Sequence, residues 1–345
     1  MEMLDSSDES LRKAGAALAA GRLVAIPTET VYGLGADAFN AVAVARVFEA
    51  KARPAFDPLI VHISSLADID RVAASFPPKA RLLAESLWPG PLTMILPKRN
   101  EVPDIVTSGL ETVAVRFPSH TLARKIIAYS GTVVAAPSAN PFGYISPTTA
   151  AHVARTLGNR IDFIIDGGPC VVGVESTVID MTYGTPALLR PGGMPLERIR
   201  DIVGEVLLPK KKGGPIASPG QLKSHYAPHA RLYLHDWKSL PESAAANSLI
   251  AASDLAAASD RATSGSRSAA IVFDADRAVV VAASCRFDRI CVLSETGDMV
   301  EAAARLFALL HELDILGFES IHAERVPEEG LGRAVNDRLS RAAKK

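Results

Sequence analysis

Short apolar runs that stop abruptly at a proline punctuate the N-terminal part of this chain. Leu23–Ile26 ends at Pro27, and Thr132–Ala136 ends at Pro137. Because proline lacks the backbone N–H that an inner strand must donate, each run predicts a buried strand that ends there. Helical patterns separate these runs, so we predict an α/β domain with a large, twisted mixed sheet and flanking helices.

The same part of the chain contains further elements of both kinds. Asn40 precedes the Ala-rich segment Ala41–Lys51, which predicts a helix with an asparagine N-cap. Helices are also expected over Leu11–Ala20 and Thr121–Tyr129. The other expected strands are Leu59–Ile63, Leu92–Leu96, Thr112–Arg116, Phe163–Asp166, Ser176–Asp180 and Ala187–Arg190.

A segment rich in proline and glycine, from Lys210 to Gly220, interrupts the pattern and predicts a connector of defined course. A smaller Rossmann-like α/β domain is expected beyond it. We therefore predict a domain over residues 1–207, a linker over 208–229 and a second domain over 230–345. Its expected elements are strands at Arg231–Leu234, Ala270–Phe273, Arg289–Leu293 and Ser320–Ala323, a helix at Met299–Leu313, and an Ala- and Ser-rich segment from Pro241 to Ser268.

Composition places the chain among globular proteins. Of its 345 residues, 48% are hydrophobic and 22% charged, with 37 basic against 38 acidic residues. No apolar run approaches the length of a membrane helix, and the acidic start does not resemble a signal peptide. We expect a soluble cytoplasmic protein. The balanced charge excludes a global basic field, but binding a single triphosphate needs only a few well-placed cations.

Several well-known catalytic motifs are absent. The chain contains no G-x-x-x-x-G-K-[ST] loop and no G-x-S-x-G elbow, and His311-Glu312 does not continue into a zinc-protease motif. Gly33–Ala38 matches the loose dinucleotide pattern G-x-G-x-x-A. Pro27–Tyr32 separates that pattern from its strand, however, which argues against a dinucleotide-binding turn.

Clusters of small and polar residues follow the predicted strands and helices, where α/β proteins often bind ligands. Each one taken alone has an ordinary explanation as a turn or a helix end, and a lone histidine in an apolar strand is more often a core residue. The clusters are Pro27–Gly35, Lys51–Pro54, His62, Pro137–Pro141, Gly173–Val178 and Leu188–Gly192.

Taken in order, these clusters resemble the YrdC-like domain of L-threonylcarbamoyladenylate synthases over about residues 10–205. The motifs are P-T-E-T-V-Y-G-L-G, K-A-R-P, L-I-V-H-I, T-V-A-V-R-F-P, P-S-A-N-P, E-S-T-V-I-D and L-R-P-G. Ser218–Gly220, His225–Pro228, Glu329–Ala334 and Asn336–Arg338 resemble the linker and C-terminal domain of the two-domain form of that family.

The resemblance implies an enzyme, a nucleotidyltransferase that makes threonylcarbamoyl-AMP and pyrophosphate from L-threonine, bicarbonate and ATP. Mg²⁺ would accompany ATP, held by phosphates and waters rather than by a protein metal site. The product would pass to a second complex that transfers the threonylcarbamoyl group to an adenosine beside the tRNA anticodon. Direct contact with tRNA is left open.

The resemblance also implies roles for individual residues, without a covalent nucleophile. Those expected to bind L-threonine and its carbamate are Thr30, His62, Arg116, Ala136 and Ser176. Those expected to bind ATP are Lys51, Arg53, Asp57, Thr112, Ser138, Asn140, Ser146, Arg190 and the linker residue Tyr226, which would fold back over the nucleotide. Asp57 departs from the family, which often has asparagine there, and an anion beside phosphates is unfavourable unless it faces ribose or a metal.

Two other functions are weighed. A YrdC-like fold could serve as an RNA-binding or regulatory module without synthase activity. The presence of all the small-molecule residues favours the enzyme. A carbamoyltransferase relative such as a hydrogenase maturation protein would carry zinc-finger regions, and this chain has no C-x-x-C pair.

Overall fold

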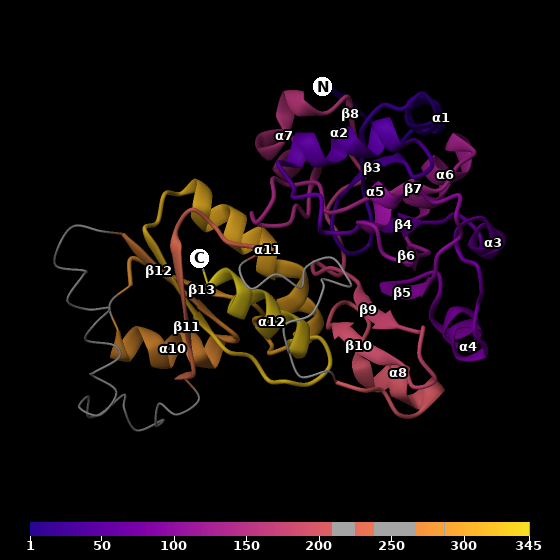
Figure 1. The fold of residues 1–345 in the computed structure, drawn as a ribbon. Coiled ribbons are helices and arrows are strands. Elements are labelled where there is room, and N and C mark those ends of the chain that lie inside the picture. Colours follow the sequence, from indigo (N-terminus) through magenta and orange to yellow (C-terminus); the bar gives the residue numbers. More distant parts are fainter. Residues whose placement is uncertain (209–224, 238–266, 286, 345) are drawn as a thin grey trace. The chain divides into compact units, whose positions relative to one another are not determined.

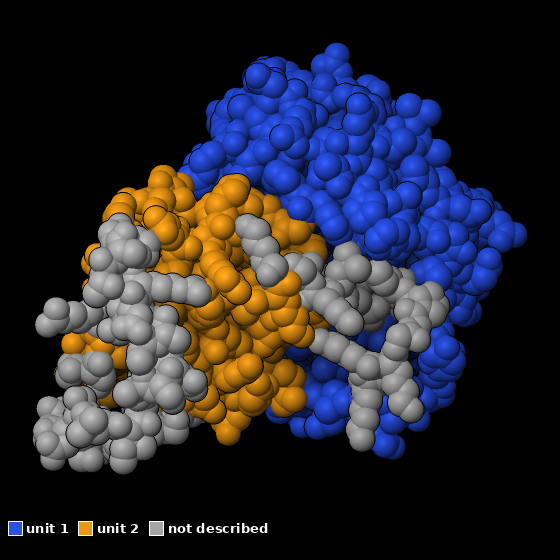
Figure 2. Space-filling model, turned by 60° about the vertical axis from the view of Figure 1, so that its left-hand side comes forward, with its two compact units in different colours: residues 1–142, 146–222 blue, residues 143–145, 223–345 orange. Residues whose placement is uncertain are grey.

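The computed structural model describes residues 1–208, 225–237, 267–285 and 287–344. The chain divides into two compact units: unit 1 comprises residues 1–142 and 146–222, and unit 2 comprises residues 143–145 and 223–345 (Figures 1 and 2). The connector from Lys210 to Gly220 and almost all of the Ala- and Ser-rich segment lie outside the described residues. Within the described residues, no helix is both long enough and apolar enough to span a membrane.

Unit 1 is built on a ten-stranded mixed sheet with the order β1-β8-β2-β3-β7-β4-β6-β5-β9-β10. The sheet and its flanking helices confirm the predicted fold class. The strands are β1 (Glu2–Leu4), β2 (Val24–Ile26), β3 (Gly33–Asp37), β4 (Ile60–His62), β5 (Leu92–Pro97), β6 (Thr112–Arg116), β7 (Val134–Ala135), β8 (Phe163–Ile165), β9 (Thr177–Asp180) and β10 (Ala187–Arg190).

The helices of unit 1 include the predicted one over residues 41–51, where the Asn40 side chain accepts hydrogen bonds from the amides of Val42 and Ala43. The α-helices are α1 (Asp8–Ala19), α2 (Ala41–Lys51), α3 (Ile69–Val72), α4 (Pro78–Leu87), α5 (Asp104–Thr107), α6 (Thr121–Ser130), α7 (Ala150–Thr156) and α8 (Leu196–Val203), and the 3₁₀ helices are η1 (Leu66–Asp68) and η2 (Gly158–Arg160).

The alternation of side chains along the strands divides the interior of unit 1 into separate clusters. On β2, Val24 and Ile26 pack with residues of α1 and α6, whereas Ala25 packs with residues of α2 and α7 on the opposite face. Helices therefore cover both faces of this part of the sheet, as its fully apolar strands require.

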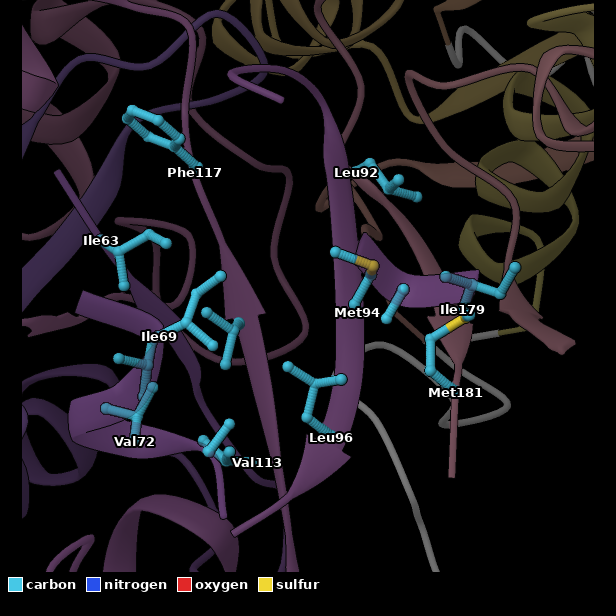
Figure 3. Close-up of a cluster of buried hydrophobic side chains, with 14 of the residues drawn as sticks. Ile63, Ile69, Val72, Leu92, Met94, Leu96, Val113, Phe117, Ile179 and Met181 are labelled. Carbon is cyan, nitrogen blue, oxygen red and sulfur yellow. The ribbon is translucent and has the colours of Figure 1, made fainter. Parts of the chain in front are cut away.

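A second large cluster lies against one face of β4, β5, β6 and β9, where the residues alternate in the same way. Val113 and Val115 of β6 enter this cluster together with residues of α4 and α8. Figure 3 shows part of it, including Met94 and Leu96 of β5. The alternate residues of β6, which include Thr112 and Arg116, project from the opposite face, where the apolar cluster is small. Thr112 and Arg116 thus lie on the face of the sheet opposite the large apolar cluster.

Strand β3 was not predicted, since its sequence G-L-G-A-D reads as a loop. Two glycines lower the expected tendency to form a strand, but the structure requires at least one of them. A Cβ at Gly35 would lie 2.9 Å from Cγ1 of Val134 and 3.2 Å from the carbonyl oxygen of Val24. The loose dinucleotide pattern therefore lies largely within an inner strand and not in a turn between a strand and a helix.

Unit 2 contains a four-stranded, all-parallel sheet with the order β11-β14-β12-β13. This smaller parallel sheet confirms the predicted second α/β domain. Its described elements are β11 (Arg231–His235), β12 (Ser268–Val272), α10 (Ala275–Ser284), β13 (Arg289–Val292), α11 (Met299–Ile315), β14 (Ser320–Glu324) and α12 (Gly332–Ala342). Strand β12 begins two residues earlier than predicted, so Ser268 belongs to the sheet.

Candidate active site

Three polar residues form a row across the middle of the unit 1 sheet. His62 of β4 lies beside Arg116 of β6 in the parallel register, and Arg116 lies opposite Thr93 of β5 in the antiparallel register. All three are buried. The sheet registers therefore bring together a histidine, an arginine and a hydroxyl from strands far apart in the sequence.

Arg116 forms an ion pair with Glu29, which lies in the loop between β2 and β3. One terminal nitrogen of the guanidinium is 2.8 Å from Oε1 of Glu29, and both side chains are about 5% exposed. Burial alone would raise the pKa of Glu29, but the Arg116 guanidinium, together with the backbone amides of Glu29 and Ser119, outweighs that effect and holds the pKa below its ordinary value. The pair is thus charged on both sides and buried.

His62 is neutral beside this ion pair. Burial, together with the nearby Arg116 guanidinium, lowers the pKa of His62 to about 3. One ring nitrogen, Nδ1, lies 3.2 Å from the carbonyl oxygen of Ile60. A neutral imidazole can donate or accept a hydrogen bond here without changing the charge of the site.

Thr30 and Ala136 line two neighbouring turns. The hydroxyl oxygens of Thr28 and Thr30 are 2.9 Å apart, and the Thr28 hydroxyl donates to the carbonyl oxygen of Val31 at 2.6 Å. Ala136 directly follows β7, and its amide donates to the carbonyl oxygen of Ile60 at 2.9 Å. These contacts order both turns.

Ser176 and Arg190 are in direct contact. Nε and one terminal nitrogen of Arg190 donate to the carbonyl oxygen of Ser176 at 3.1 and 2.9 Å, and the terminal nitrogen also reaches the Ser176 hydroxyl at 3.2 Å. That hydroxyl is 2.7 Å from the hydroxyl of Thr93. Ser176 therefore joins Arg190 to the row that contains Arg116.

A second group of buried charges surrounds the loop from Pro137 to Pro141. The ammonium of Lys51 donates to the carbonyl oxygens of Ser138 and Asn140. Burial, with the Arg53 charge nearby, lowers the pKa of Lys51 well below its ordinary value, and Asp57 acts in the opposite direction. Lys51 thus holds the loop that presents Ser138 and Asn140.

Arg53 and Asp57 form a fully buried ion pair at 2.9 Å. The guanidinium also donates to the carbonyl oxygens of Asp57 and Pro58 at 3.1 and 3.0 Å. Burial raises the pKa of Asp57, and the charges of Arg53, Lys51 and Arg190 act against it. The influence of Arg190 on Asp57 shows that the two groups of charges adjoin. Whether Asp57 touches ATP stays a prediction.

The remaining predicted residues lie in three places. The Ser146 hydroxyl donates to the carboxylate of the buried Glu175, and Thr112 begins β6 on the same face as Arg116. Tyr226 belongs to unit 2, where it is buried against Phe307, with ring centroids 5.5 Å apart, and beneath the guanidinium of Arg338. Its expected role over the nucleotide stays a prediction.

Sequence reasoning did not assign three residues that the structure places in this site. They are Glu29, which pairs with Arg116, Glu175, which accepts from Ser146, and Thr93, which contacts Ser176. Glu29 lies in the motif P-T-E-T-V-Y-G-L-G next to Thr30, and Glu175 lies in E-S-T-V-I-D next to Ser176. Thr93 is the polar residue in the apolar run L-T-M-I-L, and that contrast was the available signal.

No group of three or more histidine, cysteine, aspartate or glutamate residues is arranged to hold a metal ion in the described part of the chain. The buried charges instead form oppositely charged pairs and hydrogen bonds to backbone carbonyls. Such an arrangement is suited to anions with several oxygens, which guanidinium and ammonium groups recognise.

Comparisons with known proteins identify the family of the chain. The family model described as "Telomere recombination" matches residues 16–192, and "Threonylcarbamoyl-AMP synthase, C-terminal domain" matches residues 194–344. The chain is 44% identical to the threonylcarbamoyl-AMP synthase of Pyrococcus abyssi, covering 96% of this chain and 94% of that one. It is 40% identical to the synthase of Bacillus subtilis, covering 99% and 94%.

A solved structure is similar over both units. The crystal structure of P. abyssi Sua5 complexed with L-threonine has a TM-score of 0.89 at 39% identity, covering 99% of this chain and 98% of that one. The two family models, the relatives and the solved structure all support membership of the same family. The chain belongs to the threonylcarbamoyl-AMP synthase family.

Proposed function

We propose that this enzyme is a nucleotidyltransferase that converts L-threonine, bicarbonate and ATP into threonylcarbamoyl-AMP and pyrophosphate. The observation that carries the proposal is the pair of adjoining buried charge groups on unit 1, one around Arg116 and the other around Lys51 and Arg53. An amino acid with a carboxylate and a nucleotide with phosphates are two different anions, and the site has a cationic group for each.

In this proposal, Arg116 binds the carboxylate of threonine in bidentate fashion, and Thr30, His62, Ala136 and Ser176 surround the rest of the amino acid. The free amine of threonine attacks the carbon of bicarbonate and forms a carbamate as water leaves, and an oxygen of the carbamate then attacks the α-phosphorus of ATP as pyrophosphate leaves. Neither step needs a covalent protein nucleophile. Because a carbamate readily loses carbon dioxide, a buried site that excludes water and fixes orientation supplies the main advantage.

The ATP phosphates would lie against Lys51, Arg53 and Arg190. A phosphate anion beside Lys51 would favour its charged form and oppose the effect of burial. Hydroxyl and amide groups of Thr112, Ser138, Asn140 and Ser146 would complete the nucleotide site, and Tyr226 would cover it. Mg²⁺ would neutralise phosphate charge while it is held by phosphates and waters.

The product would be consumed by a separate complex that modifies tRNA beside the anticodon. A YrdC-like module that binds RNA without making this product is the competing proposal. The two are separated by incubating the protein with ATP, L-threonine, bicarbonate and Mg²⁺ and measuring pyrophosphate. Release that requires both threonine and bicarbonate is the expected result. Release that ignores threonine, or no release, would overturn the synthase proposal.

A further inference from the structure

Glu29 is a buried carboxylate whose contacts are incomplete. It is 4% exposed, and the Arg116 guanidinium, with smaller contributions from the backbone amides of Glu29 and Ser119, favours its charged form. Among the residues that the structure describes, neither carboxylate oxygen meets the geometry of a full hydrogen bond, even though one lies 2.8 Å from the guanidinium. A buried carboxylate in this condition has capacity for a further donor.

Arg116 has matching capacity on its own side. Its Nε and one terminal nitrogen, Nη2, are buried and have no hydrogen-bond partner of full geometry among the described residues, although Nη2 is the nitrogen that lies 2.8 Å from Oε1 of Glu29. Because Nη2 carries two N–H groups, one can face Glu29 while the other remains for a ligand. These two nitrogens form one edge of the guanidinium, and such an edge can bind both oxygens of a carboxylate. Arg116 can therefore receive a substrate carboxylate beside Glu29.

The surroundings add little competing charge. The pKa of His62 is about 3, so its ring is neutral, and burial also lowers the pKa of the half-buried His120. One positive and one negative charge thus dominate this group. A charged ligand that enters this group without adding a net buried charge carries one positive and one negative charge, as a zwitterion does.

Threonine is such a ligand, because its ammonium and carboxylate are attached to the same carbon. We infer that the Glu29 carboxylate binds the ammonium of the incoming threonine while Arg116 binds its carboxylate. This inference rests on the proposed function and adds a residue to it. Glu29 is a positioning residue for the amino acid, and the four charges alternate in sign around the bound substrate.

The test compares two ligands by isothermal titration calorimetry with the full-length chain. One ligand is L-threonine, and the other is 2,3-dihydroxybutanoate, in which a hydroxyl replaces the amine. The wild-type protein should prefer threonine. Equal affinity for the two ligands would overturn the inference without any variant.

Glu29→Gln should weaken threonine binding by about tenfold to a hundredfold, the range for a charge-assisted hydrogen bond, and should change binding of the analogue far less. Glu29→Asp keeps the charge and should retain the preference for threonine. Glu85→Gln, on the exposed surface of α4, is the matched control and should behave as wild type.

An equal loss of both ligands in Glu29→Gln would mean that Glu29 only orients Arg116, and it would overturn the inference. Unchanged threonine binding would do the same. Failure of the proposed function has a different signature: the wild-type protein would not bind threonine, or would release no pyrophosphate in its presence.

Discussion

The two units use buried polar residues for different purposes. In unit 2, Asn336 of α12 binds the backbone of Val326 in both directions, accepting from its amide at 3.0 Å and donating to its carbonyl oxygen at 2.8 Å. Asp337 accepts from Arg338 and Arg341 of its own helix. These side chains bind groups of the unit's own fold.

In unit 1, the buried charges converge from separate elements on one face of a sheet. Glu29 and Arg116 have atoms without full hydrogen bonds among the described residues, and the oxygens of Asp57 share this property although Arg53 lies 2.9 Å away. Burying such groups costs stability, so their convergence indicates a ligand-binding role. The comparison teaches that the convergence of buried charges from separate strands and loops, more than burial itself, distinguishes the site from the scaffold.

Among these variants, Arg53→Ala should have the largest effect, because it removes a cation that we propose to bind phosphate and leaves Asp57 buried without its ion-pair partner. The free energy of unfolding should fall by about 3–5 kcal/mol, as measured by urea denaturation. Pyrophosphate release should fall by about a hundredfold or more. Adding Asp57→Asn should restore stability but not activity. Recovery of both would show that Arg53 is only structural.

Asn336→Ala tests the other side of the comparison. Loss of its bonds to Val326 leaves two buried backbone groups unpaired, and the free energy of unfolding should fall by about 1–3 kcal/mol. Threonine-dependent pyrophosphate release per folded molecule should stay at the wild-type level. A large loss of activity in a folded sample would break the division between scaffold and site.

Asp57→Asn should have a smaller effect. The substitution removes the counter-charge of Arg53 but keeps a side chain of similar shape, and Arg53 retains the carbonyl oxygens of Asp57 and Pro58 as acceptors. We expect a loss of about 1–2 kcal/mol in unfolding free energy, with activity at saturating ATP close to wild type. A severe loss of activity at saturating ATP would assign Asp57 a specific part in the reaction.

The pH dependence of the free energy of unfolding should reveal that His62 is neutral in the folded protein. Its pKa is about 3 in the folded protein and about 6.5 when unfolded, so the unfolded chain binds the additional proton between these values. The stabilisation is complete above about pH 6.5 and is lost as the pH falls toward 3, by about 1 kcal/mol per pH unit. His62→Gln should remove this component of the slope. An unchanged slope would contradict the assignment.

Much of the fold followed from local signals. Prolines after apolar runs predicted β2 and the position of β7, apolar runs alone predicted β4 and β6, and the Asn40 cap predicted α2, because strand ends and helix starts have strong local chemistry. Strand β3 could not be predicted in this way, since Gly35 is explained by the close approach of Val134, a contact with a distant part of the sequence.

Only part of the candidate site could be predicted from the sequence, for the same reason. Arg116 and Ser176 were identified by the resemblance of their motifs, but their partners Glu29 and Thr93 depend on strand register. A register that pairs residues so far apart in the sequence cannot be obtained from one short motif. The difference between buried charges that serve the site and those that stabilise the fold can be recognised only when their contacts are known.

The most direct test of the central claim is to identify the product by mass spectrometry, using ATP, L-threonine, Mg²⁺ and bicarbonate labelled at its carbon. The account predicts threonylcarbamoyl-AMP that carries the label, formed by the wild-type protein and lost in Arg53→Ala/Asp57→Asn although that variant is folded. An adenylate without the label, or AMP alone, would contradict it.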